Sequence, residues 1–193
     1  MKKQIAVLIS LALFLAGCVS IAELPERINI QAPLPQDIRS VVIQAMPMRP
    51  GTIKNVENLT DAPQLFARYV KDALALKRPG WQIKLADEES AMPDRDIIIT
   101  TELLEIDGGS AALRFWIGLT TGATQSTIAV SVLDKTGNNL ATGTISERTI
   151  CPVGACVESN EDTVRRNLQS LARDVAEFIM DPAEYEKKKG STS

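Results

Sequence analysis

The chain has 193 residues, of which 45% are hydrophobic and 23% are charged, a composition typical of a globular domain that buries a core. Its 21 basic and 24 acidic residues give a net charge of −3, which argues against a protein that binds nucleic acid through a strong positive field. Histidine is absent, which excludes imidazole general bases, Ser-His and Cys-His nucleophile pairs, and the commonest metal ligand.

The N-terminal segment has the order of a lipoprotein signal. It begins with Lys2 and Lys3, continues with an apolar run over residues 5–15, and ends in Leu15-Ala16-Gly17-Cys18. The apolar run is shorter than the roughly 20 residues that a membrane-spanning helix needs. The segment resembles the lipobox of bacterial lipoproteins, which implies that residues 1–17 are removed and that Cys18 is acylated. The alternative is an ordinary secretory signal with an incidental cysteine.

The next segment, residues 18–37, contains Pro25, Pro33 and Pro35, and its apolar residues follow no sustained period. We expect a semi-extended, lipid-anchored linker that holds the domain away from the bilayer. Neither residue 19 nor residue 20 is aspartate. The absence of aspartate at these positions resembles the sorting pattern of enteric bacterial lipoproteins. This resemblance implies delivery to the outer membrane, facing the periplasm.

Residues 38–181 contain the strand and helix patterns of one domain. A helix is predicted to start at Asp61, with Pro63 in its first turn, and to end before Pro79-Gly80. Short β-branched or alternating runs predict strands over residues 40–46, 81–85 and 96–106.

The clearest alternation covers residues 125–134, and residues 140–150 follow it as the expected partner strand of a hairpin. A second helix is predicted from a cap at residues 159–162 to Asp181-Pro182. Its apolar residues recur at helical spacing, namely Val164, Leu168, Leu171, Val175 and Ile179. Residues 182–193 are expected to be a disordered polar tail.

An apolar stretch over residues 111–119 gathers aromatic side chains around one cation, in Arg114, Phe115 and Trp116. One interpretation is a core strand or arch of the sheet. The other is an exposed surface that meets a partner or lipid. We expect a strand with Leu113 and Ile117 inward and with Arg114 and Trp116 outward, because residues two apart share a face of a strand.

Two cysteines remain if Cys18 carries lipid, and they are Cys151 and Cys156. In an oxidising compartment this pair is expected to form a structural disulfide around Pro152 and Gly154. A redox-active pair is the weaker alternative, because the spacing is not C-x-x-C and nothing basic flanks it.

No catalytic motif emerges from the sequence, and we expect neither a metal site nor a cofactor site. Glu102 and Glu105 lie three apart on a predicted strand, so they are expected to point to opposite faces. The acidic run over residues 87–89 is interpreted as a solvated turn, with a cation site as the alternative.

The stretch from Gly109 to Gly122, the strand ending Val132-Leu133-Asp134-Lys135-Thr136-Gly137, and the final amphipathic helix resemble bacterial lipoproteins grouped under domain of unknown function 4410. The order of lipobox, strand, helix, Pro-Gly-Trp, strands and closing helix is also similar to the auxiliary lipoproteins of ABC-type lipid-transport systems. Neither group supplies catalytic residues, and the two-cysteine loop is a feature of neither.

The sequence therefore predicts an α+β domain with a mostly antiparallel sheet of four to five strands and two helices packed on one face. The expected function is that of a lipid-anchored, non-enzymatic envelope lipoprotein that binds or positions a protein partner in assembly or transport, through a surface that includes Arg114, Phe115 and Trp116. The alternatives are a periplasmic envelope enzyme whose carboxylates are brought together by folding, and a stress-related adaptor.

Overall fold

A computed structural model describes residues 19–91, 95–116, 119–151 and 159–190. Its strands are β1 (Val19–Ile30), β2 (Ser40–Ala45), β3 (Ile53–Lys54), β4 (Gln82–Leu85), β5 (Ile97–Asp107), β6 (Leu119–Asp134) and β7 (Asn139–Cys151). Its α-helices are α2 (Ala62–Lys77), α3 (Ala111–Trp116), α4 (Asn160–Met180) and α5 (Pro182–Gly190), and a 3₁₀ helix covers Ala86–Ala91. No helix within these ranges is long and apolar enough to cross a membrane.

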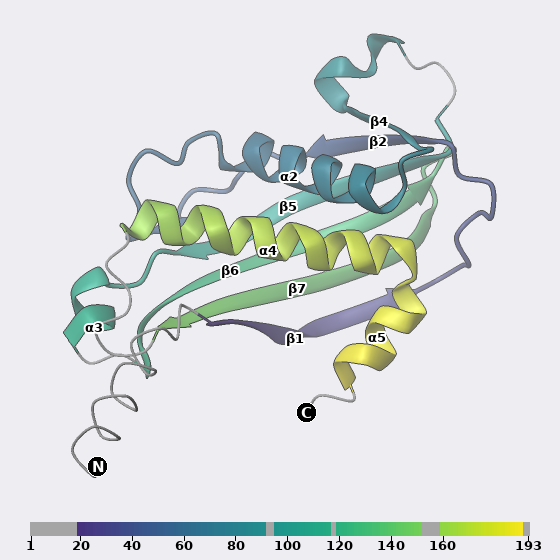
Figure 1. Ribbon diagram of the computed structural model, residues 1–193. Helices are drawn as coiled ribbons and strands as arrows, with labels where there is room; N and C mark the ends of the chain where they lie inside the picture. Colours follow the sequence, from purple (N-terminus) through teal and green to yellow (C-terminus); the bar gives the residue numbers. More distant parts are fainter. Residues whose placement is uncertain (1–18, 92–94, 117–118, 152–158, 191–193) are drawn as a thin grey trace, which may run out of the picture.

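The described strands form one seven-stranded sheet, whose main path has the order β1-β7-β6-β5-β2-β4 (Figure 1). Strand β3 is paired to β5 outside this path. The α+β class is confirmed, whereas the prediction of four to five mostly antiparallel strands is wrong in detail. The pairs between β1 and β7, β7 and β6, and β6 and β5 are antiparallel, but β2 is parallel to both β4 and β5. The reason is the crossover, since α2 connects β2 to β4 and a strand reached through a helix returns in the same direction.

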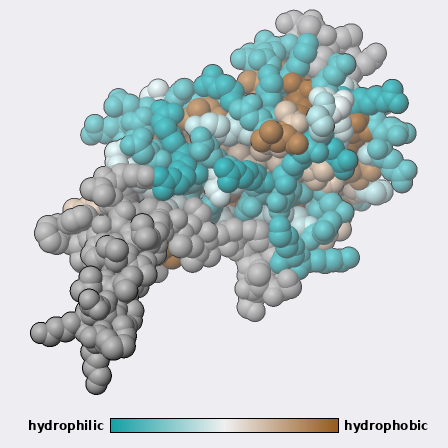
Figure 2. Space-filling view, viewed as in Figure 1, coloured by the Kyte–Doolittle hydropathy of each residue, from teal (hydrophilic) through white to brown (hydrophobic). Residues whose placement is uncertain are grey.

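The core lies between the sheet and two helices, because α2 and α4 run side by side across the same face (Figure 1). Alternate strand residues such as Ile97, Ile99 and Val130 are buried against these helices. The helical spacing predicted for α4 is confirmed, since its five apolar positions are all fully buried. The outer surface of this helix layer is mostly hydrophilic (Figure 2).

The two main helices differ in how their N-termini are capped. Ser159 is the N-cap of α4, and its side chain accepts a hydrogen bond from the backbone N–H of Asp162 at 3.0 Å. Asp61 holds the predicted N-cap position of α2 without a side-chain capping bond, and it instead lies 3.6 Å from Arg68.

The predicted hairpin of residues 125–134 and 140–150 is confirmed as β6 and β7. Its turn depends on Asp134, whose carboxylate accepts hydrogen bonds from the backbone N–H groups of Thr136 and Asn138 at 2.8 and 2.9 Å. Together with the side chains of the same two residues, these bonds hold the pKa of Asp134 well below its usual range. Gly137 completes the turn with a φ of 89°.

The segment expected to be a linker is strand β1 in this structure, paired antiparallel with β7 along the edge of the sheet. Proline does not exclude this arrangement, because an edge strand tolerates a residue that cannot donate a hydrogen bond. Pro25 falls inside the register shift between Glu23 and Arg27, where the ladder is interrupted. The other two prolines of the segment come after β1.

Two segments that were not predicted to be helical contain helices. The region expected to be a strand at residues 111–119 begins with helix α3, where the hydroxyl of Ser110 accepts a hydrogen bond from the backbone N–H of Leu113 at 3.3 Å. Helix formers at Ala111, Ala112 and Leu113 then outweigh the β-forming aromatic residues. The expected disordered tail contains helix α5, which is held by Tyr185 at 3% exposure.

Candidate functional site

A pocket and those predicted site residues that the structure describes lie at one end of the sheet. β1 starts, β7 ends and β6 starts there, as the pairs Val19 with Ile150 and Leu119 with Cys151 show. β5 ends at the same place, where Asp107 pairs with Lys54 of β3. We call this the Val19 end; β4 begins at the opposite end, directly after Trp81.

Only part of the predicted site falls within the described residues. Cys18 lies outside the described residues, immediately before β1. Cys151 is the last residue of β7, and Cys156 lies outside the described residues, so the disulfide stays a prediction. Arg114, Phe115 and Trp116 are the last three residues of α3.

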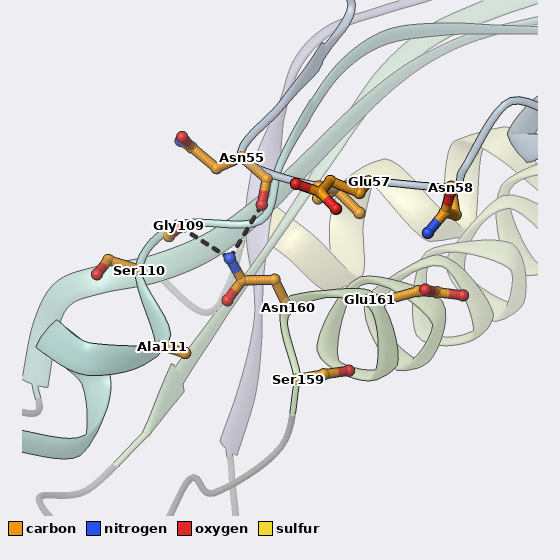
Figure 3. Close-up of a pocket in the computed structure, with 10 residues that line it drawn as sticks. Asn55, Glu57, Asn58, Gly109, Ser110, Ala111, Ser159, Asn160 and Glu161 are labelled. Carbon is orange, nitrogen blue, oxygen red and sulfur yellow. Dashed lines mark hydrogen bonds between the residues drawn. The ribbon is translucent and has the colours of Figure 1, made fainter.

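A pocket of about 790 Å³ opens beside α3. Its walls come from the loop after β3, the turn between β5 and α3, and the first turn of α4 (Figure 3). The lining residues are Asn55, Val56, Glu57, Asn58, Gly109, Ser110, Ala111, Ser159, Asn160 and Glu161.

Asp107 and Asn160 hold these three segments together. The Asp107 carboxylate accepts hydrogen bonds from the side-chain amide of Asn55 and from the backbone N–H of Gly109, both at 2.8 Å. From α4, the side-chain amide of Asn160 donates to the carbonyl oxygens of Asn55 at 2.9 Å and Gly109 at 3.3 Å (Figure 3). The backbone of the pocket is therefore fixed by side chains from distant parts of the chain.

Glycine is required where these segments meet. A Cβ on Gly108 would lie 2.5 Å from Val56 Cγ2 and 2.6 Å from the carbonyl oxygen of Asn55. Gly109 has a φ of 62°, and a Cβ there would collide with the carbonyl oxygens of Gly122 and Ala123.

The polar groups of the pocket have structural roles. The hydroxyls of Ser110 and Ser159 cap α3 and α4. Glu161 accepts two hydrogen bonds from Arg165, at 2.9 and 3.0 Å, which raises the pKa of that guanidinium. The lining offers carbonyl and carboxylate oxygens that can accept hydrogen bonds from a ligand. It contains no nucleophile next to a general base, which is the arrangement that covalent catalysis needs. Within the described part of the chain, no cluster of acidic or cysteine side chains could hold a metal ion.

A family model described as Domain of unknown function (DUF4410) matches residues 29–151, which is more than half of the chain. The chain belongs to the DUF4410 family. The match extends from the last two residues of β1 to the end of β7, so α4 and α5 lie beyond it. None of the curated proteins matches the sequence.

Several solved structures are similar to this DUF4410 chain. The PelC dodecamer from Paraburkholderia phytofirmans is 11% identical with a TM-score of 0.44, over 80% of this chain and 96% of that chain. Protein XCC0632 from Xanthomonas campestris is 8% identical with a TM-score of 0.45, over 86% of this chain and 97% of that chain. Protein CT253 from Chlamydia trachomatis is 14% identical with a TM-score of 0.44, over 73% and 95% of the two chains.

Glu102 and Glu105 share a face of the DUF4410 sheet, contrary to the expectation from their spacing. The register of β5 against β6 shifts between Leu103 and Glu105, so that Glu102 pairs with Ala129 and Glu105 pairs with Thr127. Residues two apart on β6 point to the same face, and the bulge therefore brings both carboxylates to the side away from the helices. Each one forms an ion pair at 2.8 Å, Glu102 with Arg49 and Glu105 with Lys54.

The acidic run at residues 87–89 falls in the 3₁₀ helix. Glu88 accepts a hydrogen bond from Lys71 at 2.7 Å and one from the backbone N–H of Leu85 at 3.2 Å. These bonds lower the pKa of Glu88. Glu88 therefore ties the turn to α2.

Sequence reasoning missed a buried polar contact between α4 and β7. The Asn167 side-chain amide donates to the carbonyl oxygen of Glu147 at 3.3 Å and to Thr149 Oγ1 at 3.1 Å. All three residues are at most 1% exposed. The helical period contained a signal for it, because position 167 falls on the same face of α4 as Val164 and Leu171.

Proposed function

We propose that this protein is a lipid-anchored, non-enzymatic lipoprotein of the bacterial cell envelope that holds a protein partner at a membrane surface during envelope assembly or transport. The observation that carries the proposal is the position of β1. The signal-like segment ends at Cys18, and the sheet begins with the next residue. A lipid on Cys18 would therefore be attached to the folded domain itself.

The attachment has a mechanical consequence. β1 is paired with β7 over residues 19–23 and 27–30, so force on the lipid is transmitted through β1 to β7. One acyl chain gives marginal membrane binding, whereas two or more give stable binding. A multiply acylated Cys18 would hold the domain, and any protein bound to it, against the bilayer.

The state of the polar groups supports a binding role over catalysis. The pocket hydroxyls cap helices, and the carboxylates on the open face of the sheet are ion-paired. A general acid at neutral pH needs a carboxyl whose pKa is raised. The pKa values of Glu88, Asp96 and Glu177 are instead lowered by hydrogen bonds.

The proposed location is the outer membrane, facing the periplasm. It is supported by the residues after Cys18, which are valine and serine rather than aspartate.

The test compares the wild-type chain with Cys18→Ala in a bacterium that has both membranes. We expect the wild type to incorporate a clickable fatty acid and to fractionate with the outer membrane, and the variant to do neither. Cys151→Ala is the matched control, because it removes another cysteine and should keep the label. A labelled and membrane-bound Cys18→Ala protein would overturn the proposal.

The geometry of Glu102 and Glu105 favours a second candidate, an envelope enzyme acting on the cell wall. Two carboxylates on one face are the minimum that glycoside hydrolysis requires. The test measures the release of fragments from purified peptidoglycan. Release by the wild type that is abolished by Glu102→Gln and also by Glu105→Gln would support the enzyme. If the wild type releases no fragments, the result favours the binding role over the enzyme.

A further inference from the structure

The distance between the membrane anchor and the sheet is set by the start of β1. Val19 is already paired with Ile150 of β7, and only one residue step separates it from Cys18. One extended residue spans about 3.5 Å. If Cys18 is acylated, which this inference takes from the proposed function, the Val19 end of the sheet must lie at the surface of the bilayer.

Helix α3 is at this same end. It precedes β6, whose first residue pairs with Cys151 at the end of β7, and it packs against both strands. Figure 1 shows α3 beyond the ends of β6 and β7, on the side where β1 begins. An anchor at Cys18 therefore brings α3 to the membrane, whereas the starts of α5 and β4 lie at the opposite end of the sheet.

The composition of α3 suits the interface between lipid headgroups and acyl chains. Its six residues contain leucine, phenylalanine and tryptophan with a single arginine. Leu113 is 41% exposed, so the folded domain leaves an apolar side chain of this helix uncovered. Tryptophan is enriched at membrane interfaces, where its ring meets apolar chains and its N–H meets headgroups. Exposed apolar side chains on a short helix next to a lipid anchor bind bilayers by burying apolar area.

We propose that α3 is a second membrane contact, which enters the headgroup region of the bilayer that holds the lipid of Cys18. Two contacts at separate points fix the orientation of the domain, so that the sheet stands on its Val19 end. Helix α3 then meets lipid rather than a protein, and the protein partner binds elsewhere.

The chain contains its own pair of probes, because it has two tryptophans. Trp116 ends α3 at the Val19 end, whereas Trp81 precedes β4 at the opposite end, with its ring 5.8 Å from the guanidinium of Arg78. Trp81→Phe leaves Trp116 as the reporter, and Trp116→Phe leaves Trp81 as the matched control.

The mature lipoprotein is reconstituted into vesicles of phosphatidylethanolamine and phosphatidylglycerol, with or without bromine on the acyl chains near the headgroup. We expect brominated lipid to quench Trp116 in the Trp81→Phe protein and to leave Trp81 unquenched in the Trp116→Phe protein. Adding Leu113→Ser to Trp81→Phe should reduce the quenching without changing the melting temperature, because Leu113 is exposed.

Flotation of the same vesicles separates the two proposals. Two results would overturn the proposed membrane contact of α3 and leave the anchor intact. In both, the protein floats with the vesicles, but either Trp116 stays unquenched or both tryptophans are quenched equally. Protein that lacks the acyl mass and does not float overturns the anchor and this inference together.

Discussion

Cys151 is the last residue of β7, and its partner in the predicted disulfide is five positions further along the chain. A disulfide between Cys151 and Cys156 would close a very small loop, so its expected contribution to stability is about 2 kcal/mol. Thiol labelling of the denatured, non-reduced mature protein should find no free cysteine. Two labelled cysteines would show that the pair is reduced.

Gly108 tests how closely the segments of the pocket must approach. Gly108→Ala forces a methyl group against the backbone of Asn55, and overpacking of this kind costs about 1–3 kcal/mol. Gly80 is the matched control, since a Cβ there meets nothing within 4 Å. We expect Gly80→Ala to leave the free energy of unfolding in urea unchanged or slightly raised. Equal effects of both substitutions would contradict the close packing.

At the scale of the element, α5 gives the sharpest contrast with the sequence expectation. Tyr185 is 3% exposed, and its ring meets that of Phe178 edge to face with centroids 5.9 Å apart. Tyr185→Ala should therefore lower the free energy of unfolding by about 3 kcal/mol, as truncation of a buried aromatic residue does. Glu186→Ala, exposed on the same helix, is the control. A disordered tail would make both substitutions neutral.

Elements with a strong period were predictable, and those decided by tertiary contacts were not. Helix α4 and the hairpin of β6 and β7 followed directly from their apolar spacing. Strand β1 could not be recognised, because the prolines that argued for a linker are compatible with an edge strand whose partner is a distant segment. Helix α3 was missed because its aromatic residues favour strands, while the capping role of Ser110 was overlooked.

The candidate site was predictable to a smaller degree. The spacing of Glu102 and Glu105 predicted opposite faces, and the bulge at Leu104 reversed that result without leaving a clear mark in the sequence. The pocket is built from three segments that are far apart along the chain. A single sequence has no signal for the bonds of Asn160 to Asn55 and Gly109 that join them.

At the scale of the whole molecule, the sheet joins the first strand to the last one. β1 pairs with β7, although more than a hundred residues separate Val19 from Ile150. This pairing makes β1 the edge of the sheet and puts the residue after Cys18 at the same end of the sheet as α3. Periodicity reveals which residues are buried, but it contains no information on which strand lies next to which. The order and direction of the strands could therefore not be predicted from the sequence, whereas the α+β class could.

The central claim is that the folded domain is tethered to a membrane by a lipid on Cys18. The most direct measurement is the mass of the N-terminal peptide of the protein purified from membranes. We expect a chain that begins at Cys18, with a diacylglyceryl group on its sulfur atom. A chain that begins at another residue, or an unmodified Cys18 in the membrane fraction, would contradict it.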